Sequence, residues 1–274
     1  MLFPVERRSH SVAARICAMN QPPAAAAANN LRVATYNIHK GVQGIGPARR
    51  LEIHNLGHAI EQLDADIVCL QEVRKMNRQA AARFARWPEL PQADFLAPEG
   101  YTAVYETNAV TRHGEHGNAL LTRWPVIRTG HQDISDHRFE QRGLLHVVIE
   151  VEGQPVHAIV VHLGLIKGSR VRQIARLREF IDREVPAHEA VVVAGDFNDW
   201  GARMRYAMNA MGLRDASDLR GPRTLTYPSR LPVAQLDFVY GRKLEPLSCT
   251  VPRGPIWARM SDHLPLVADF SLPN

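Results

Sequence analysis

The sequence predicts a mixed α/β fold in one domain, and three observations lead to this class. Short apolar runs alternate with helical patterns from Leu31 onward. Strand-like stretches on either side of the turn residue Gly153 add an antiparallel hairpin. No repeat or low-complexity linker divides residues 31–274, and a chain of 274 residues with 45% hydrophobic residues can bury a sizeable core.

The first half of this domain supplies two predicted strands and a helix. Residues 31–36 and residues 66–70 (DIVCL) are short apolar runs typical of buried strands. Between them, apolar residues recur at helical spacing and are expected to share one face: Ile53, Leu56, Ile60 and Leu63.

The second half of the domain shows the same alternation of predicted strands and helices. Residues 155–161 and 190–194 are predicted strands, and Ser169 is the expected N-cap of the helix between them. The apolar residues of that helix are expected to face inward: Val171, Ile174, Leu177, Ile181 and Val185. Residues 142–151 are the first strand of the hairpin that turns at Gly153.

Residues 1–30 are predicted to be a disordered extension. They contain a Gln-Pro-Pro segment and an alanine run, and their few apolar residues are too interrupted for a secretory signal. No segment approaches the roughly 20 apolar residues of a membrane-spanning helix. The three cysteines lie far apart without a CxxC pair, which favours reduced thiols and a cytoplasmic protein, with peripheral membrane association as the alternative.

The positive charge is modest and thinly spread along the sequence. The chain carries a net charge of +5, from 33 basic and 28 acidic side chains. Residues 1–30 hold three arginines and one glutamate, which leaves a net charge of +3 for residues 31–274. Since affinity for nucleic acid comes from clustered basic residues, this distribution is weak support for a polyanionic partner.

Two polar residues occur where predicted strands emerge from the sheet. Asn37 ends the first strand in TYNIHKG, and Glu72 ends another in DADIVCLQEV. Open α/β sheets usually build their sites at such ends. Each residue also has a structural interpretation, because Asn37 can start a turn and Glu72 can cap the following helix.

The segment VVVAGDFNDW is a sharper signal. Four apolar residues run directly into Gly195, Asp196, Phe197 and Asn198. If the strand stays extended through Phe197, the side chains of Asp196 and Asn198 point the same way and can orient one water. A plain Asp–Asn turn is the alternative.

Acidic residues and histidines follow in three further segments. Asp237 lies in the predicted strand LDFVY, and Asp262 and His263 precede the strand of SDHLPLVADF. A carboxylate beside a histidine fixes its tautomer and stabilises its charged form, so Asp237 is the expected partner of His263. His162 ends the strand of VHAIVVHLG and is expected at the same sheet edge, although a buried structural histidine is the alternative.

These residue types suggest hydrolysis at phosphorus. Hard oxygen ligands such as Glu72 and Asn37, with no nearby cysteine, suit Mg²⁺ or its substitute Mn²⁺. Such a metal binds substrate phosphate directly, so the protein mainly positions the attacking water and stabilises the spread negative charge.

Six segments in this order, TYNIHKG, LQEV, VHLG, GDFND, LDFV and SDHLPL, resemble the endonuclease/exonuclease/phosphatase superfamily. This group contains deoxyribonuclease I, abasic-site endonucleases, inositol-polyphosphate 5-phosphatases and neutral sphingomyelinases. The resemblance spans residues 31–270. It implies a four-layer α/β/β/α sandwich of two mixed β-sheets flanked by helices, with the site at one end of the sandwich.

The resemblance also implies roles for the residues of these segments. Glu72 would be the principal metal ligand, Asn37 would position the metal or the phosphate, and Asp262 is a further candidate ligand. Asp196 would orient or deprotonate the attacking water, and Asn198 would contact the phosphate.

Two histidines complete the implied site. His263, held by Asp237, would stabilise the pentacovalent transition state, and His162 takes the place of a second histidine found in several members. Which histidine protonates the leaving group stays open. Abasic-site endonucleases carry a tyrosine-containing motif where this chain has His162, so the chain is more similar to the deoxyribonuclease I, phosphatase and sphingomyelinase branches.

Further segments resemble bacterial members described as metal-dependent hydrolases: His39 and Lys40, HGEHGNALLTRWP, and RGLL. They make Lys40, His116 and Arg142 candidate substrate contacts, with ordinary surface roles as the alternative.

The expected function is therefore that of a Mg²⁺-dependent phosphoesterase acting on a phosphodiester or phosphomonoester. The candidate substrates are nucleic acid, inositol phosphates and phospholipid head groups, and the low charge slightly favours the last two over a nuclease. The alternative from a different class is a catalytically inactive module that binds a phosphate ligand. The sequence argues against it, because every polar position expected of an active member is filled. The sequence indicates no obligate protein partner.

Overall fold

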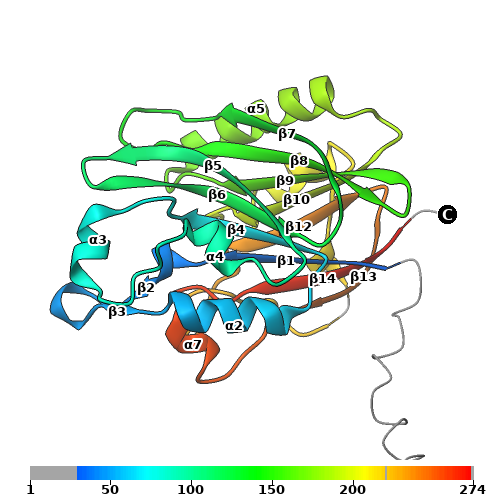
Figure 1. Cartoon of the computed structure of the whole chain (residues 1–274). Coiled ribbons are helices and arrows are strands. Elements are labelled where there is room, and N and C mark those ends of the chain that lie inside the picture. The colour runs from blue at the N-terminus through cyan, green and yellow to red at the C-terminus, as the bar shows by residue number, and fades with distance from the viewer. Residues whose placement is uncertain (1–29, 220, 273–274) are drawn as a thin grey trace, which may run out of the picture.

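The computed structural model describes residues 30–219 and 221–272, which form two six-stranded sheets packed face to face (Figure 1). The first sheet has the order β13-β14-β1-β4-β6-β5, and the second has the order β11-β12-β10-β9-β8-β7. Each sheet contains both parallel and antiparallel pairs.

The strands of the first sheet are β1 (Asn30–Asn37), β4 (Ile67–Val73), β5 (Thr102–Thr111), β6 (Gly114–Thr122), β13 (Glu245–Thr250) and β14 (Leu266–Ser271). Those of the second are β7 (Val126–Asp133), β8 (Gly143–Val151), β9 (Gln154–His162), β10 (Ala190–Asp196), β11 (Arg214–Asp215) and β12 (Asp237–Arg242). A small ribbon pairs β2 (Val42–Gln43) with β3 (Arg50–Leu51).

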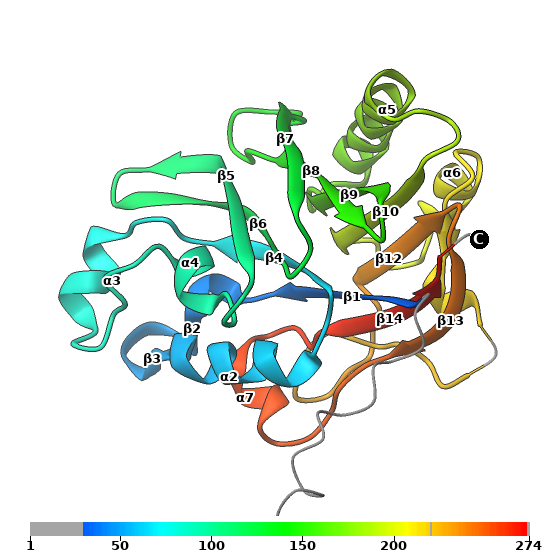
Figure 2. The same ribbon diagram turned by 45° about the vertical axis from the view of Figure 1, so that its right-hand side comes forward.

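Helices cover the outer face of each sheet, as the rotated view shows (Figure 2). The first sheet is covered by α2 (Ile53–Leu63), α4 (Gln92–Leu96) and α7 (Trp257–Met260), and the second by α5 (Lys167–Glu184) and α6 (Arg205–Asn209). The remaining helices are α3 (Arg78–Arg83) and the 3₁₀ turns η1 (His39–Gly41), η2 (Gly46–Ala48) and η3 (Ala216–Asp218). One apolar core lies between the sheets and one under each helical layer. The four-layer prediction is confirmed.

The predicted strands and helices are present, and the start of α5 is the main correction. Its N-cap residue is Ile166, so the prediction that Ser169 caps the helix is wrong. Ser169 lies in the first turn, and its hydroxyl donates to Asp136 Oδ2 at 2.7 Å, a partner far away in the sequence. Val171, expected to face inward, is 51% exposed, whereas the other four apolar residues of the predicted stripe are buried.

The strand directions bring several strand ends to one end of the sandwich. β4 runs parallel to β1, and β9 runs parallel to β10, so the carboxyl ends within each pair coincide. β14 and β12 run antiparallel to β1 and β10, so their amino ends lie there too. This end therefore collects the polar residues that the sequence places at strand ends.

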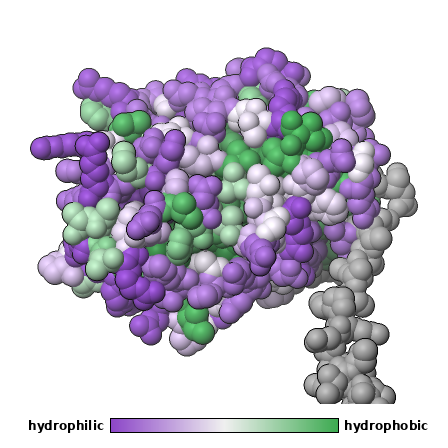
Figure 3. All heavy atoms as spheres, in the orientation of Figure 1, coloured by the Kyte–Doolittle hydropathy of each residue, from purple (hydrophilic) through white to green (hydrophobic). Residues whose placement is uncertain are grey.

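Residues 1–29 of the predicted disordered extension lie outside the described residues, and Asn30 is the first residue of β1. Within residues 30–219 and 221–272, no helix is both long and apolar enough to cross a membrane. The face in Figure 3 is mostly hydrophilic, with apolar residues in separate patches.

A buried histidine pair lies beneath α5, away from the strand ends. His146 on β8 and His157 on β9 are each 2% exposed. Their rings join through His146 Nε2 and His157 Nδ1 at 2.9 Å, and His157 Nε2 lies 2.5 Å from Glu189 Oε2. Burial lowers the pKa of both histidines, and lowers that of His146 to about 4.

This pair predicts a loss of stability in acid. Below pH 6.5, the ordinary pKa of histidine, the unfolded chain binds protons that folded His146 does not, so the free energy of unfolding falls as the pH drops towards 4. We expect His146→Gln to reduce that fall by on the order of 2 kcal/mol in urea unfolding. His188→Gln, at an 84% exposed side chain, is the control. Equal slopes for the wild type and His146→Gln would contradict the prediction.

Candidate active site

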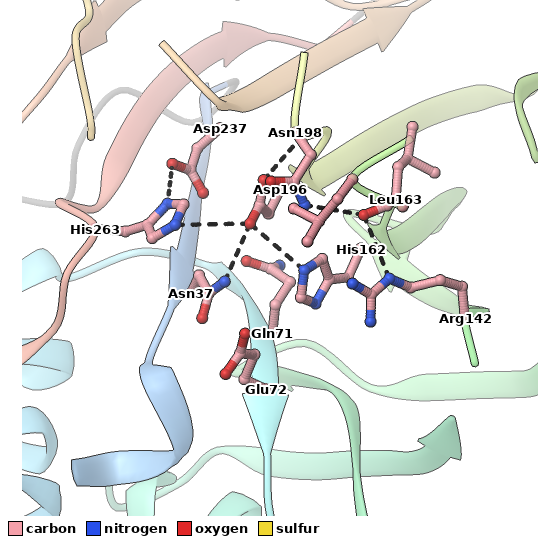
Figure 4. Close-up of polar contacts among 12 residues, drawn as sticks. Asn37, Gln71, Glu72, Arg142, His162, Leu163, Asp196, Asn198, Asp237 and His263 are labelled. Atoms are coloured by element: carbon pink, nitrogen blue, oxygen red, sulfur yellow. Dashed lines mark hydrogen bonds and ion pairs between the residues drawn. The ribbon is translucent and has the colours of Figure 1, made fainter. Parts of the chain in front are cut away.

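Asp196 lies at the centre of the polar residues where the two sheets meet (Figure 4). It is the last residue of β10, and its register partners are His162 on β9 and Asp237 on β12. From the other sheet, Asn37 at the end of β1 donates its Nδ2 to Asp196 Oδ2 at 3.1 Å. The two sheets thus contribute to one cluster.

The carboxylate of Asp196 is 1% exposed and surrounded by possible donors. Its Oδ1 accepts the backbone N–H of Asn198 at 2.9 Å. Its Oδ2 lies 3.5 Å from His162 Nε2 and 3.7 Å from His263 Nε2. Burial raises the pKa of Asp196, and the charge of His263 only partly opposes this shift. A raised pKa suits a group that accepts a proton from water.

His263 is held between two carboxylates. Its Nδ1 lies 2.8 Å from Asp237 Oδ2, and both residues are buried. Burial alone would lower the pKa of His263, but the charges of Asp237 and Asp196 outweigh it and raise the pKa. The raised pKa favours the charged form of the ring, whose Nδ1 donates to Asp237 and whose Nε2 faces Asp196. In its charged form the ring has no lone pair for a metal, and the trio is then a charge-paired cluster.

His162, on the other side of Asp196, has the opposite pKa shift. Its side chain is 7% exposed, and burial followed by the charge of Arg142 lowers its pKa well below the ordinary value. One carboxylate thus lies between a charged and a neutral histidine. Neighbouring groups whose pKa values are driven apart are typical of acid–base sites.

Asn198 follows Asp196 into this cluster. β10 ends at Asp196, but the backbone N–H of Phe197 still donates to the Leu236 carbonyl at 2.8 Å, and the left-handed conformation (φ +49°) occurs at Asn198 itself. The side-chain Nδ2 of Asn198 donates to the carbonyl of Leu163 at 2.9 Å, which leaves its Oδ1 without a protein donor in the described chain.

Glu72 projects from a bulge in β4. The strand continues to Val73, three residues beyond the predicted run of residues 66–70 and one beyond Glu72, and its pairing with β6 shifts between Leu70 and Val73. Glu72 has a left-handed backbone (φ +59°), an uncommon conformation for a residue with a side chain. It does not cap a helix, because the N-cap residue of α3 is Asn77. Strain of this kind clusters at functional sites.

The carboxylates of Glu72 and Asp262 each contact a basic side chain. Lys40 Nζ lies 2.6 Å from Glu72 Oε2, and His39 Nδ1 lies 3.1 Å from Asp262 Oδ1. His39 and Lys40 both have left-handed backbones, which turn the chain back towards the site. Burial would raise the pKa of Glu72, but the Lys40 ammonium outweighs it and holds the pKa well below its usual range.

The predicted metal ligands offer oxygen donors of the kind that Mg²⁺ or Mn²⁺ prefers. Glu72 and Asp262 supply carboxylates, and both already attract positive charge. Asn37 Oδ1 supplies a neutral oxygen, which also accepts the backbone N–H of His39 at 3.1 Å. Hard oxygen donors with net negative charge are what these ions prefer.

Comparison with known proteins places this site in a family. The Endonuclease/Exonuclease/phosphatase family model matches residues 34–263. The chain belongs to this family. Proteins of the Endonuclease/Exonuclease/phosphatase family are in general phosphoesterases.

Relatives agree with the family assignment. The protein YbhP of Escherichia coli (strain K12), itself uncharacterized, is 35% identical over 248 residues, which cover 89% of this chain and 97% of YbhP. Among solved structures, the human Nocturnin catalytic domain with bound sulfate has a TM-score of 0.68 at 22% identity, covering 89% of this chain and 94% of that chain. The mannosyl-6-phosphatase Bt3783 of Bacteroides thetaiotaomicron has a TM-score of 0.67 at 17% identity, covering 88% and 100%. These two likenesses show the shared fold.

Three predicted substrate contacts lie around the family site. Lys40 contacts Glu72, as described above. Arg142 is 13% exposed, and its guanidinium donates to Glu140 Oε1 at 3.2 Å and to the Leu163 carbonyl at 3.3 Å. His116 is half-buried on β6, and burial followed by the charge of Lys40 lowers its pKa to about 4.

Two further residues, not predicted from the sequence, support the family motifs. Ser261 is fully buried, and its hydroxyl donates to the Asn37 carbonyl at 2.6 Å, which fastens the segment before His263 to β1. The ring of Tyr227 lies 4.9 Å from that of His263, between centroids. Ser261 is the first residue of the SDHLPL motif, so it could have been predicted from the sequence, whereas nothing in the sequence around Tyr227 indicates this contact.

Proposed function

We propose that this protein is a Mg²⁺-dependent phosphoesterase that hydrolyses a phosphodiester or a phosphomonoester by in-line attack of water. The observation that carries the proposal is buried Asp196, which lies between a charged and a neutral histidine and is hydrogen-bonded to Asn37. The candidate metal ligands are Glu72, Asp262 and Asn37. When bound, Mg²⁺ would neutralise charge on the phosphate and on the leaving oxygen.

The chain's own residues would move one proton and stabilise one developing charge. Asp196 accepts a proton from the attacking water, whose oxygen forms a bond to phosphorus as the bond to the leaving oxygen breaks. Asn198 Oδ1, free of a protein donor, accepts a hydrogen bond from that water, and the second N–H of its Nδ2 is the group that would contact the phosphate. The His263 imidazolium, fixed by Asp237, stabilises negative charge on the phosphoryl oxygens. The leaving oxygen departs as an alcohol after taking up a proton.

Chelation is the direct test. We expect the purified protein to hydrolyse bis(4-nitrophenyl) phosphate or 4-nitrophenyl phosphate with Mg²⁺ or Mn²⁺, to lose this turnover in EDTA, and to regain it when excess Mg²⁺ is added. The assay follows nitrophenol release. Full turnover in EDTA would overturn the metal requirement.

The same experiment separates the enzyme from a binding module. A panel of plasmid DNA, RNA, inositol phosphates and phospholipid head groups extends the two chromogenic esters. Turnover of any member supports the proposal, and its salt dependence tests the nuclease alternative, because release of counterions makes polynucleotide binding steeply salt-dependent. No turnover across the whole panel would favour an inactive module.

A further inference from the structure

A basic pocket adjoins the proposed site on the side of Glu72. It is a cavity of about 110 Å³, lined by four cationic side chains, those of Lys40, Arg49, Arg74 and Arg83. No carboxylate is among its lining residues. Four basic side chains that are spread along the sequence therefore lie around one cavity in the fold. The volume has room for several water molecules, or for a tetrahedral oxyanion in their place.

The charges in this pocket are incompletely compensated. Lys40 is paired with Glu72, and Arg83 donates to the backbone carbonyls of Gly46 and Pro47 at 2.8 and 3.3 Å. Neither Arg49 nor Arg74 makes an ion pair within residues 30–219 and 221–272. Cations held together in this way favour an anionic ligand.

A buried glutamine joins two walls of the basic pocket. Gln92 is 1% exposed, its Oε1 accepts the Arg74 backbone N–H at 2.8 Å, and its Nε2 donates to the Lys40 carbonyl at 2.9 Å. Gly41 leaves room for this contact, because a Cβ there would lie 2.8 Å from Gln92 Nε2. The spacing between Lys40 and Arg74 is therefore set by the core and not by surface side chains.

The basic pocket and the proposed site share Lys40, and Arg74 follows Glu72 by two residues. We propose that the basic pocket binds a second phosphate group of the substrate, next to the ester that is hydrolysed. The preferred substrate is then an ester that carries at least two phosphates. This inference rests on the proposed function for the identity of the reacting group, but the pocket itself is testable without turnover.

The test uses two matched esters. The nitrophenyl ester of thymidine 5′-phosphate is compared with the same ester carrying a 3′-phosphate, both with Mg²⁺. We expect the doubly phosphorylated ester to have a kcat/KM about tenfold higher, as one charge-assisted hydrogen-bonded contact provides. In Arg49→Ala and in Arg74→Gln this ratio should fall towards one. In the control Arg178→Ala, at an exposed arginine of α5, the ratio should be that of the wild type.

Binding without metal distinguishes the two proposals. In EDTA, calorimetry compares thymidine 3′,5′-bisphosphate with thymidine 5′-phosphate on the wild type and Arg49→Ala. Tighter binding of the bisphosphate than of the monophosphate, lost in Arg49→Ala, supports the basic pocket. If this binding is seen but no ester is hydrolysed, the proposed function fails and the pocket proposal stands. Equal kcat/KM for both esters together with equal binding of both nucleotides would overturn the pocket proposal. Competition by an inositol bisphosphate or a short oligonucleotide tells which source of the second phosphate fits better.

Discussion

Asp196→Asn is expected to lower kcat by about 10²-fold or more, the scale of removing one preorganised electrostatic contact. The asparagine keeps the shape of the side chain but cannot accept the proton of the attacking water. It also removes one of the three carboxylates that raise the pKa of His263, so the charged form of that ring is less favoured. A small change in KM is expected, because the side chain is 1% exposed and acts on the reacting atoms.

This variant should remain folded. The raised pKa of Asp196 means that its neutral form is tolerated in the native state, so the amide should change the free energy of unfolding by about 2 kcal/mol or less. Steady-state kinetics and urea unfolding measure the two effects, with Asp182→Asn, at an exposed residue of α5, as the control. Near-normal kcat in a folded Asp196→Asn protein would show that Asp196 is not the proton acceptor.

Glu72→Gln is expected to remove metal-dependent turnover by a similar factor of about 10² or more. The substitution keeps the bulge of β4 but removes the negative charge of the carboxylate. That carboxylate attracts cations, since it already pairs with the Lys40 ammonium. Lys40 is 31% exposed, so water can solvate it after the exchange and the fold should persist.

A second readout follows the metal itself. In the wild type, Mg²⁺ at about 100 times its Kd should add ~2.7 kcal/mol to the free energy of unfolding, seen as a rise in Tm. Glu72→Gln should lack most of this rise, whereas Glu61→Gln, at an exposed residue of α2, should show it in full. An undiminished Mg²⁺ effect on the Tm of Glu72→Gln would remove Glu72 from the ligand set.

Much of the fold could be predicted from the sequence, because the patterns that indicate its strands and helices are local. The strand of residues 31–36 and the stripe from Ile53 to Leu63 follow from apolar spacing, and both are present as β1 and α2. The first residue of α5 could not be predicted from local patterns. The hydroxyl of Ser169 finds Asp136 across space, and a cap prediction considers only neighbours in sequence.

The same distinction holds for the candidate site: its residue types could be predicted from local sequence, and its geometry could not. Residue types at strand ends pointed to Asn37, Glu72 and Asp196, since strand ends are local features. Their geometry depends on backbone conformations that alternation does not foresee. Asn198 turns in a left-handed conformation instead of continuing the strand, and Glu72 projects from a bulge.

The sequence by itself determined the class of fold, the family and the residue types available for chemistry at phosphorus. Only the tertiary structure decided how Asp196 is placed between two histidines whose pKa values shift in opposite directions, and which arginines surround the basic pocket. The physical reason is that pKa shifts and pockets come from burial and from charges a few ångströms apart in space. Arg49 and Arg74 are 25 residues apart in the chain. Gln92 holds Arg74 beside Lys40, and the pairing of β2 with β3 folds the segment of Arg49 back towards Lys40.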